Sequence, residues 1–203
     1  MNKKLIKYLI AVFACLAVLY PLWIVIRDST WAFNSTLILN LFPLFGLIAF
    51  SLLWLHAISG VFEPWLRKQI DFDRFVSVTA SLILICLIFH PLLLLLNTGF
   101  KFVPIFFYGK FYIWLAIIGW LLLITYDISK PLKKKYDFFI RNWNNILLIS
   151  NIGFLLTFFH SLGAGGDLQS GPLKLIWIFY GTTAIIAIIY TYGIKRFSKL
   201  AHM

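Results

Sequence analysis

The sequence predicts an all-α integral membrane protein, a single transmembrane domain of six helices over residues 1–203. Hydrophobic residues make up 62% of the chain and charged residues 12%, and the mean hydropathy is +0.92. A soluble domain is about 45–50% apolar and about 25% charged. This chain therefore carries more apolar surface than a soluble fold of its size can bury, whereas a bilayer would solvate that surface.

Apolar runs of about 20 residues recur along the chain, and a helix of that length crosses about 30 Å of hydrocarbon. The runs cover roughly residues 5–26, 37–62, 75–97, 106–126, 144–163 and 173–194. Uniformly apolar runs of this length are helices, because barrel strands are half as long and alternate in polarity. The first run lacks a small-x-small cleavage site, so it is interpreted as a retained helix rather than a signal peptide.

The distribution of lysine and arginine predicts the orientation. If the N-terminus lies in the cytoplasm, fourteen basic residues lie inside and four outside, which is a strong positive-inside bias. The inside group is Lys3, Lys4, Lys7, Arg67, Lys68, Arg74, Lys130, Lys133, Lys134, Lys135, Arg141, Lys195, Arg196 and Lys199, and the outside group is Arg27, Lys101, Lys110 and Lys174. Both termini are therefore expected in the cytoplasm. Topology and anionic inner-leaflet lipid account for the net charge of +11 without nucleic-acid binding.

Several classes of site are not supported by the residues present. Cys15 and Cys86 lie in separate apolar runs and are both expected to be buried, which suggests neither a disulfide scaffold nor a zinc site. None of the seven acidic residues falls deep in a predicted helix, which argues against a proton or cation path. The basic run 130–135 is interpreted as a topology signal, with docking of an acidic soluble partner as the alternative.

Four histidines occur, and three of them, His56, His90 and His160, lie within predicted spans. An ionisable side chain there is costly and is a functional candidate. Counted from Arg74 and Arg141, the rise of a helix places His90 about 24 Å and His160 about 28 Å across the membrane. Both are therefore expected in the outer leaflet. His56 should lie about 10 Å from the cytoplasmic edge, too far away to meet them.

Two histidines at similar depth on two parallel helices suit a haem, because each imidazole can ligate iron from one face of the porphyrin. Helix bundles build such sites from side chains on facing helices. A structural histidine that bonds across helices remains the alternative interpretation for any single one of them.

The sequence around these histidines resembles the ferric reductase-like transmembrane family, which includes NADPH oxidases, ferric reductases and bacterial membrane haem b subunits. The stretches that carry the resemblance are 45–55, Asp73-Arg74-Phe75, Phe89-His90-Pro91-Leu92-Leu93, Phe159-His160-Ser161-Leu162, 166–168 and 171–173. The resemblance covers roughly residues 40–195. It implies that His90 and His160 are cofactor-binding and metal-binding residues, the axial ligands of haem b.

The chain departs from the family pattern in one respect. Family members carry two histidines on each of these helices, about 14 residues apart, which stacks two haems about 21 Å apart. The matching positions here are Val76 and either Ile146 or Leu147, and none of them can ligate iron. The sequence thus resembles a one-haem version that keeps the outer site. His56 is expected to be a hydrogen-bonded helix contact, with a role beside an inner-leaflet cofactor as the alternative.

The resemblance implies electron transfer across a membrane, and the expected location is the bacterial plasma membrane. Few residues follow the sixth run, so the expected donor is a separate cytosolic flavin reductase, with a flavin supplied by or shared with that partner. The chain would then be the transmembrane subunit of an oxidoreductase. The rival hypothesis is a haem-free structural or assembly membrane protein that retains the same scaffold.

Overall fold

The structure, a computed structural model, describes residues 2–29, 31 and 36–195. Six of its helices are long and apolar enough to cross a membrane, which confirms the predicted fold class. They are α1 (Lys3–Asp28), α2 (Thr36–Val61), α4 (Phe72–Asn97), α5 (Lys110–Leu132), α7 (Trp143–Ala164) and α8 (Gly171–Ile188). No strand occurs in the described part of the chain. The protein is therefore an all-α, multi-pass membrane protein.

Short helices join the spans, and hydropathy alone did not predict them. The segment expected as a loop after the second span contains α3 (Glu63–Gln69), and α6 (Asp137–Arg141) precedes α7. The fourth span begins at Lys110 rather than near residue 106, because Val103–Tyr108 forms the separate 3₁₀ helix η1. Gly109, with a φ of 103°, separates the two, and few other residues adopt that backbone conformation.

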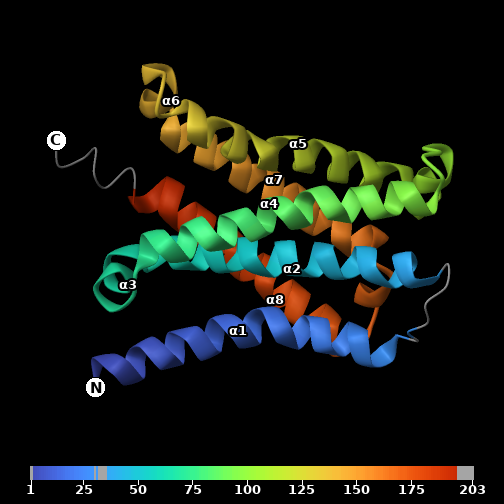
Figure 1. Ribbon diagram of the computed structural model, residues 1–203, viewed down its shortest axis with the longest axis horizontal. Helices are drawn as coiled ribbons and strands as arrows, with labels where there is room; N and C mark the ends of the chain where they lie inside the picture. The colour runs from blue at the N-terminus through green and yellow to red at the C-terminus, as the bar shows by residue number, and fades with distance from the viewer. Residues whose placement is uncertain (1, 30, 32–35, 196–203) are drawn as a thin grey trace.

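Consecutive spans run in opposite directions, so α1 begins at the end of the bundle where α8 ends (Figure 1). We call this the basic end, because all the described members of the predicted cytoplasmic group lie there, at the ends of the spans or in α3 and α6. Arg196 and Lys199 lie outside the described residues. The other end is called the opposite end. Which end faces the cytoplasm stays a prediction.

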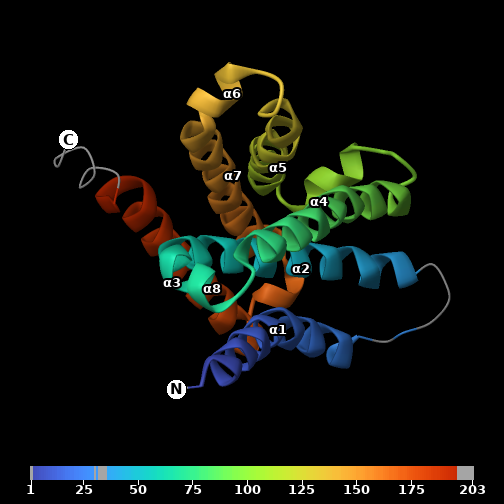
Figure 2. The same ribbon diagram turned by 60° about the vertical axis from the view of Figure 1, so that its left-hand side comes forward.

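Four of the spans form two helical hairpins. In the first, α2 packs closely along α4, and in the second, α5 packs closely along α7. The two hairpins contact each other much more lightly, and they are seen as two separate pairs in Figure 2. Within each hairpin the connection lies at the basic end and contains a short helix, α3 in the first and α6 in the second.

Close backbone approach holds the second hairpin together. A Cβ added to Gly153 would stand 2.7 Å from the carbonyl oxygen of Gly119, and one added to Gly119 would stand 2.9 Å from that of Gly153. Small residues at such crossings let membrane helices pack without a hydrophobic driving force between them. The glycine pair therefore sets the distance between α5 and α7.

Aromatic stacking fastens α8 to the first hairpin. The rings of Phe50 and Trp177 stack with centroids 4.2 Å apart, and those of Trp54 and Tyr180 stack at 4.0 Å. The Tyr180 hydroxyl also donates to the carbonyl oxygen of Ala17 at 2.8 Å, which links α8 to α1. A buried tyrosine hydroxyl needs such a partner. Most residues of the buried core thus come from α1, α2 and α8, and α4 and α7 contribute further ones.

Both hairpin connections place a cation over an aromatic ring at the start of the returning helix. The Arg67 guanidinium lies 5.1 Å from the Phe72 ring centroid, and the Lys133 ammonium lies 4.2 Å from that of Trp143. Cation–π contacts of this kind stabilise by about 0.5–1 kcal/mol where they are exposed.

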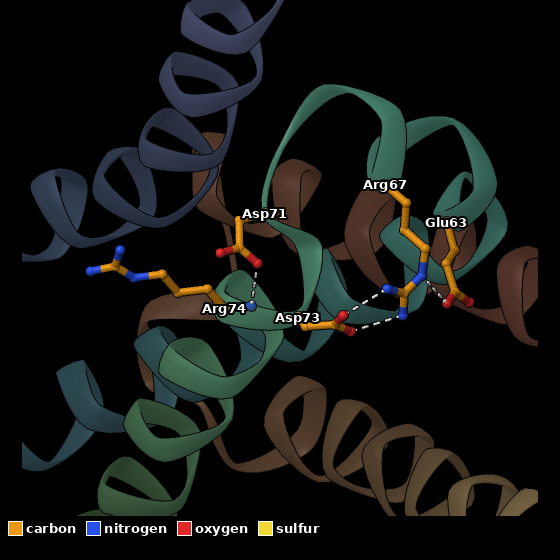
Figure 3. Close-up of polar contacts among 5 residues, drawn as sticks. All are labelled: Glu63, Arg67, Asp71, Asp73 and Arg74. Carbon is orange, nitrogen blue, oxygen red and sulfur yellow. Dashed lines mark hydrogen bonds and ion pairs between the residues drawn. The ribbon is translucent and has the colours of Figure 1, made fainter.

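Arg67 also bonds two carboxylates, that of Glu63 in its own helix and that of Asp73, which joins α3 to α4 (Figure 3). Its guanidinium bonds both oxygens of Asp73 at 2.9 Å and one oxygen of Glu63 at 2.8 Å. These bonds, the Asp73 bond foremost, raise the pKa of Arg67. Next to this network, the Asp71 carboxylate accepts from the backbone N–H of Arg74 at 3.1 Å and caps α4.

One expectation about the cysteines is wrong. Cys86 is buried as expected, whereas Cys15 is exposed on α1. The reason is that α1 packs on the bundle with one side only, and its other side presents large apolar residues such as Leu16 and Leu19 outward. Such a surface is suited to lipid.

Candidate functional site

His90 lies near the end of α4 and is held against α2. Its Nδ1 is 2.7 Å from the backbone carbonyl oxygen of Phe42. Because a carbonyl oxygen can only accept, Nδ1 carries the proton and Nε2 keeps its lone pair. Gly46 makes room for the ring, since a Cβ added there would stand 3.0 Å from two imidazole atoms.

His160 is held in the same manner in the second hairpin. Its Nδ1 is 3.0 Å from the backbone carbonyl oxygen of Tyr112 on α5. Gly163, one turn further along α7, packs on the Tyr112 ring so closely that an added Cβ would collide with it. Because the Tyr112 carbonyl oxygen can only accept, Nδ1 of His160 also carries the proton and its Nε2 keeps a free lone pair.

The two hairpins present their histidines equivalently. In each hairpin the imidazole on the second helix, α4 or α7, donates to a backbone carbonyl oxygen on the first helix, α2 or α5. The histidine and its partner are 48 residues apart in both cases. Phe42 and Tyr112 both belong to the parts of their helices nearest the opposite end. The structure therefore places His90 and His160 toward the same end of the bundle, the end that is opposite the basic one.

His56 belongs to a different part of the molecule. Its Nε2 lies 2.6 Å from the Thr79 hydroxyl on α4, and that hydroxyl is itself within 2.7 Å of the Phe75 carbonyl oxygen. The Thr79 proton is thus directed to Phe75, so the imidazole donates to Thr79. The expected helix contact is present, and it occupies Nε2, the nitrogen that carries a free lone pair in His90 and His160. His202 lies outside the described residues.

A cavity of about 650 Å³ occupies the basic half of the bundle, between the hairpins and α8. Its mouth is lined by charged side chains at helix ends, and its walls by polar and aromatic ones. The mouth residues are Glu63, Arg67, Asp73, Asp127, Lys130 and Lys195. Its deep end is apolar and includes Leu87 and Phe154, one to two helical turns before His90 and His160.

Two of the positions matched to the missing second pair of histidines line this cavity. Val76 borders it from α4 and Leu147 from α7, whereas Ile146 is buried and is not among the lining residues. Leu147 is therefore the structural counterpart of Val76. His56 is the only histidine among the lining residues, so the cavity offers no pair of imidazoles.

The donor set suits a haem better than a bare metal ion. In the described ranges, no three His, Cys, Asp or Glu side chains gather as they would around an ion. A haem needs only two axial donors from the protein, because the porphyrin supplies the other four. Two neutral imidazoles, each fixed through Nδ1, are donors of the required kind.

Sequence reasoning missed the groups that position the histidines. The carbonyls of Phe42 and Tyr112 have no side-chain signature, although the equal 48-residue spacing would have revealed them once one pair was known. It also missed the cavity. A signal was present there, because Asn144, Ser150, Asn151 and Thr191 interrupt apolar runs on the same half of the bundle.

Comparison with known proteins adds nothing to this geometry. No family model matches the chain, and neither a curated protein nor a solved structure matches it significantly. The resemblance to the ferric reductase-like family therefore stays a prediction that rests on the residues themselves.

Proposed function

We propose that this protein is a haem b-containing electron-transfer protein of the ferric reductase-like type. His90 and His160 would ligate one haem at the opposite end of the bundle. The observation that carries the proposal is the equivalent fixing of the two imidazoles, each with Nδ1 bonded to a carbonyl of the neighbouring helix. A carbonyl oxygen that accepts from the other ring nitrogen sets the tautomer and orientation of a metal-binding histidine.

The packing around the pair supports the same conclusion. His90 on α4 and His160 on α7 belong to different hairpins, and the two hairpins contact each other only lightly. A haem bound by two imidazoles supplies one-electron transfer without direct oxygen binding, because both axial positions are filled. The role of this chain is then to fix both ligands and to exclude water with its apolar surroundings.

The direction of transfer follows from the charge distribution. Ten described basic side chains belong to the first turns of α1, to α3 and to the segment 130–141, and this excess predicts that the basic end faces the cytoplasm. Electrons would come from a separate cytosolic flavin reductase and leave toward an acceptor on the outer side. The protein would be the transmembrane subunit of an oxidoreductase in a bacterial plasma membrane.

The test is haem content and spectrum of the purified protein. A pyridine haemochrome assay should give one haem b per chain, with a low-spin spectrum. His90→Ala and His160→Ala should each abolish the low-spin signal, because each removes an axial ligand. His56→Ala is the matched control and should leave the signal intact, since that ring bonds Thr79 in the other half of the bundle.

Other outcomes would favour other functions. Protein expressed with ample haem that binds none would support the structural or assembly role. Two haems per chain would place a second one in the basic-end cavity. Loss of the signal in His56→Ala but not in His160→Ala would contradict the ligand pair.

A further inference from the structure

We propose that a pocket between α1 and α3, the α1–α3 pocket, is a binding site for the phosphate group of one anionic phospholipid. The pocket lies at the basic end, has a volume of about 380 Å³ and shares only Arg67 with the larger cavity. Surface charge alone predicts a diffuse attraction to anionic lipid that involves every basic residue at that end. This pocket predicts one saturable site instead, and binding there does not depend on haem.

Cations from two separate elements converge on the α1–α3 pocket. α1 contributes three lysines from its first two turns and α3 contributes one from its last turn, and these four are Lys3, Lys4, Lys7 and Lys68. Like charges around one space repel each other, and a bound anion would replace that repulsion by attraction. The volume lies within the range of about 300–1,000 Å³ that is usual for ligand pockets, which is room for a lipid headgroup.

The four lysines lack paired carboxylates. None of them forms an ion pair within the described part of the chain. The fifth cation of the pocket, Arg67, is turned toward Glu63 and Asp73 instead (Figure 3). Asp71 is the single acidic residue among the lining residues, and its carboxylate already caps α4 through the N–H of Arg74. Four ammonium groups therefore remain as donors for phosphate oxygens, with which charge-assisted bonds are strong.

The direction of two of these lysines distinguishes a binding site from a topology signal. Lys3 and Lys7 are four residues apart, and steps of three or four residues lead from them to Ala17 and Ile24, which are buried in the core. Residues at such steps share one side of a helix, so both lysines belong to the side of α1 that packs on the bundle. A topology signal requires charge near the end of a span but not on a particular side. The placement on the packed side therefore favours a site.

A neighbouring row of residues on α1 favours a lipid as the source of the phosphate. Tyr8, Val12 and Leu16 follow Lys4 at intervals of four residues, so they lie on one side of the helix, and all three are exposed. An acyl chain that runs along this row would begin at Lys4, at the level of the pocket. A soluble phosphate ester would use the lysines alone and leave the apolar row uncovered.

The test is binding of short-chain phosphatidylglycerol to the purified, delipidated protein, counted by native mass spectrometry. One molecule should bind per chain, and phosphatidylcholine of the same chain length should bind far more weakly because it is zwitterionic. The triple change Lys3→Gln, Lys7→Gln and Lys68→Gln should weaken binding of phosphatidylglycerol by roughly a hundredfold, at about fivefold for each lysine.

A matched control separates the pocket from the general charge of the basic end. The triple change Lys133→Gln, Lys134→Gln and Lys135→Gln removes the same charge at the same end, and none of these lysines lines the α1–α3 pocket. It should hardly change the affinity. The thermal midpoint of each variant is measured without lipid, so that failure to fold is recognised.

A blocking variant tests the location without any change of charge. Gln69→Trp places an indole in the α1–α3 pocket and should abolish the saturable binding of phosphatidylglycerol. Asn145→Trp is the control, because Asn145 is an exposed amide at the start of α7 and lines neither cavity. The control variant should bind the lipid as the wild type does.

Several results would overturn the proposal. Equal weakening by the two triple changes would show diffuse attraction rather than a site, as would binding of many lipid molecules without saturation. Undiminished binding by Gln69→Trp would place the lipid elsewhere. Glycerol 3-phosphate that binds as tightly as the lipid would identify a soluble phosphate ester as the ligand, and an oligoglutamate peptide that binds more tightly would identify an acidic protein partner.

Discussion

The two hairpins carry equivalent histidines but are stabilised in different ways. In the first, α2 is central, with Phe50, Ser51 and Trp54 buried against neighbouring helices. In the second, α5 is peripheral, and Phe111, Trp114 and Leu121 are exposed on its outer side. The first hairpin is supported by tertiary packing from α1 and α8, whereas the second depends on the crossing of Gly119 and Gly153. The same histidine–carbonyl geometry is therefore stabilised by different packing interactions in the two hairpins.

The largest effect is expected when the orientation of the two hairpins in the membrane is tested by labelling, because both hairpins should have the same orientation. Both connections should be accessible from the cytoplasm, and the 165–170 connection between α7 and α8 should be accessible from the other side. Single cysteines introduced at Lys68, Lys134 and Gly166, with Cys15 and Cys86 replaced by serine and alanine, would be labelled with a membrane-impermeant reagent in intact cells. Only the Gly166 site should react. Labelling of one connection but not the other would contradict the paired topology.

A weaker effect should distinguish the hairpins by their packing. Gly153→Ala places a methyl group against a backbone carbonyl that cannot rotate away, so α5 and α7 must separate. Overpacking of this kind destabilises by about 1–3 kcal/mol, which should lower the thermal midpoint and the fraction of low-spin haem. Gly60→Ala is the control in the first hairpin, because an added Cβ meets nothing within 4 Å there. Equal losses in both variants would show that the crossing is not special.

A local effect is expected at the histidine of the first hairpin. Gly46→Ala brings a Cβ to 3.0 Å from the His90 ring, which must shift by a few tenths of an ångström. The haem should stay bound, while its reduction potential and low-spin electron paramagnetic resonance signal change, because the orientation of an axial ligand has changed. Gly60→Ala again serves as the control. An unchanged spectrum would place the haem elsewhere.

The smallest effect is expected at the first connection. Arg67→Gln removes two ion pairs whose members are all exposed, and exposed pairs contribute little to stability. The thermal midpoint and haem content should therefore hardly change. A large loss of stability would mean that this network, rather than core packing, supports the first hairpin.

The sequence predicted the spans because a bilayer demands long apolar helices, and it predicted the pairing of His90 with His160 because helical rise converts residue number into depth. It could not separate η1 from α5, since both are apolar and only the φ of Gly109 divides them. It could not predict the hydrogen-bond partners of the two histidines, because Phe42 and Tyr112 contribute backbone carbonyl oxygens, which every residue has. The cavity depends on how lightly the hairpins touch, and that is a property of tertiary packing.

The cation–π contacts at the two connections have a consequence for the distant histidines. Eighteen residues separate Phe72 from His90, and seventeen separate Trp143 from His160, which corresponds to about 27 and about 26 Å of helical rise. α4 and α7 thus hold their histidines at nearly equal distances from the cation–π contact at the start of each helix. A single residue inserted between that contact and the histidine would raise the histidine by about 1.5 Å and rotate it by about 100°. The height of each histidine along the bundle is thereby set far from the histidine itself, at the basic end.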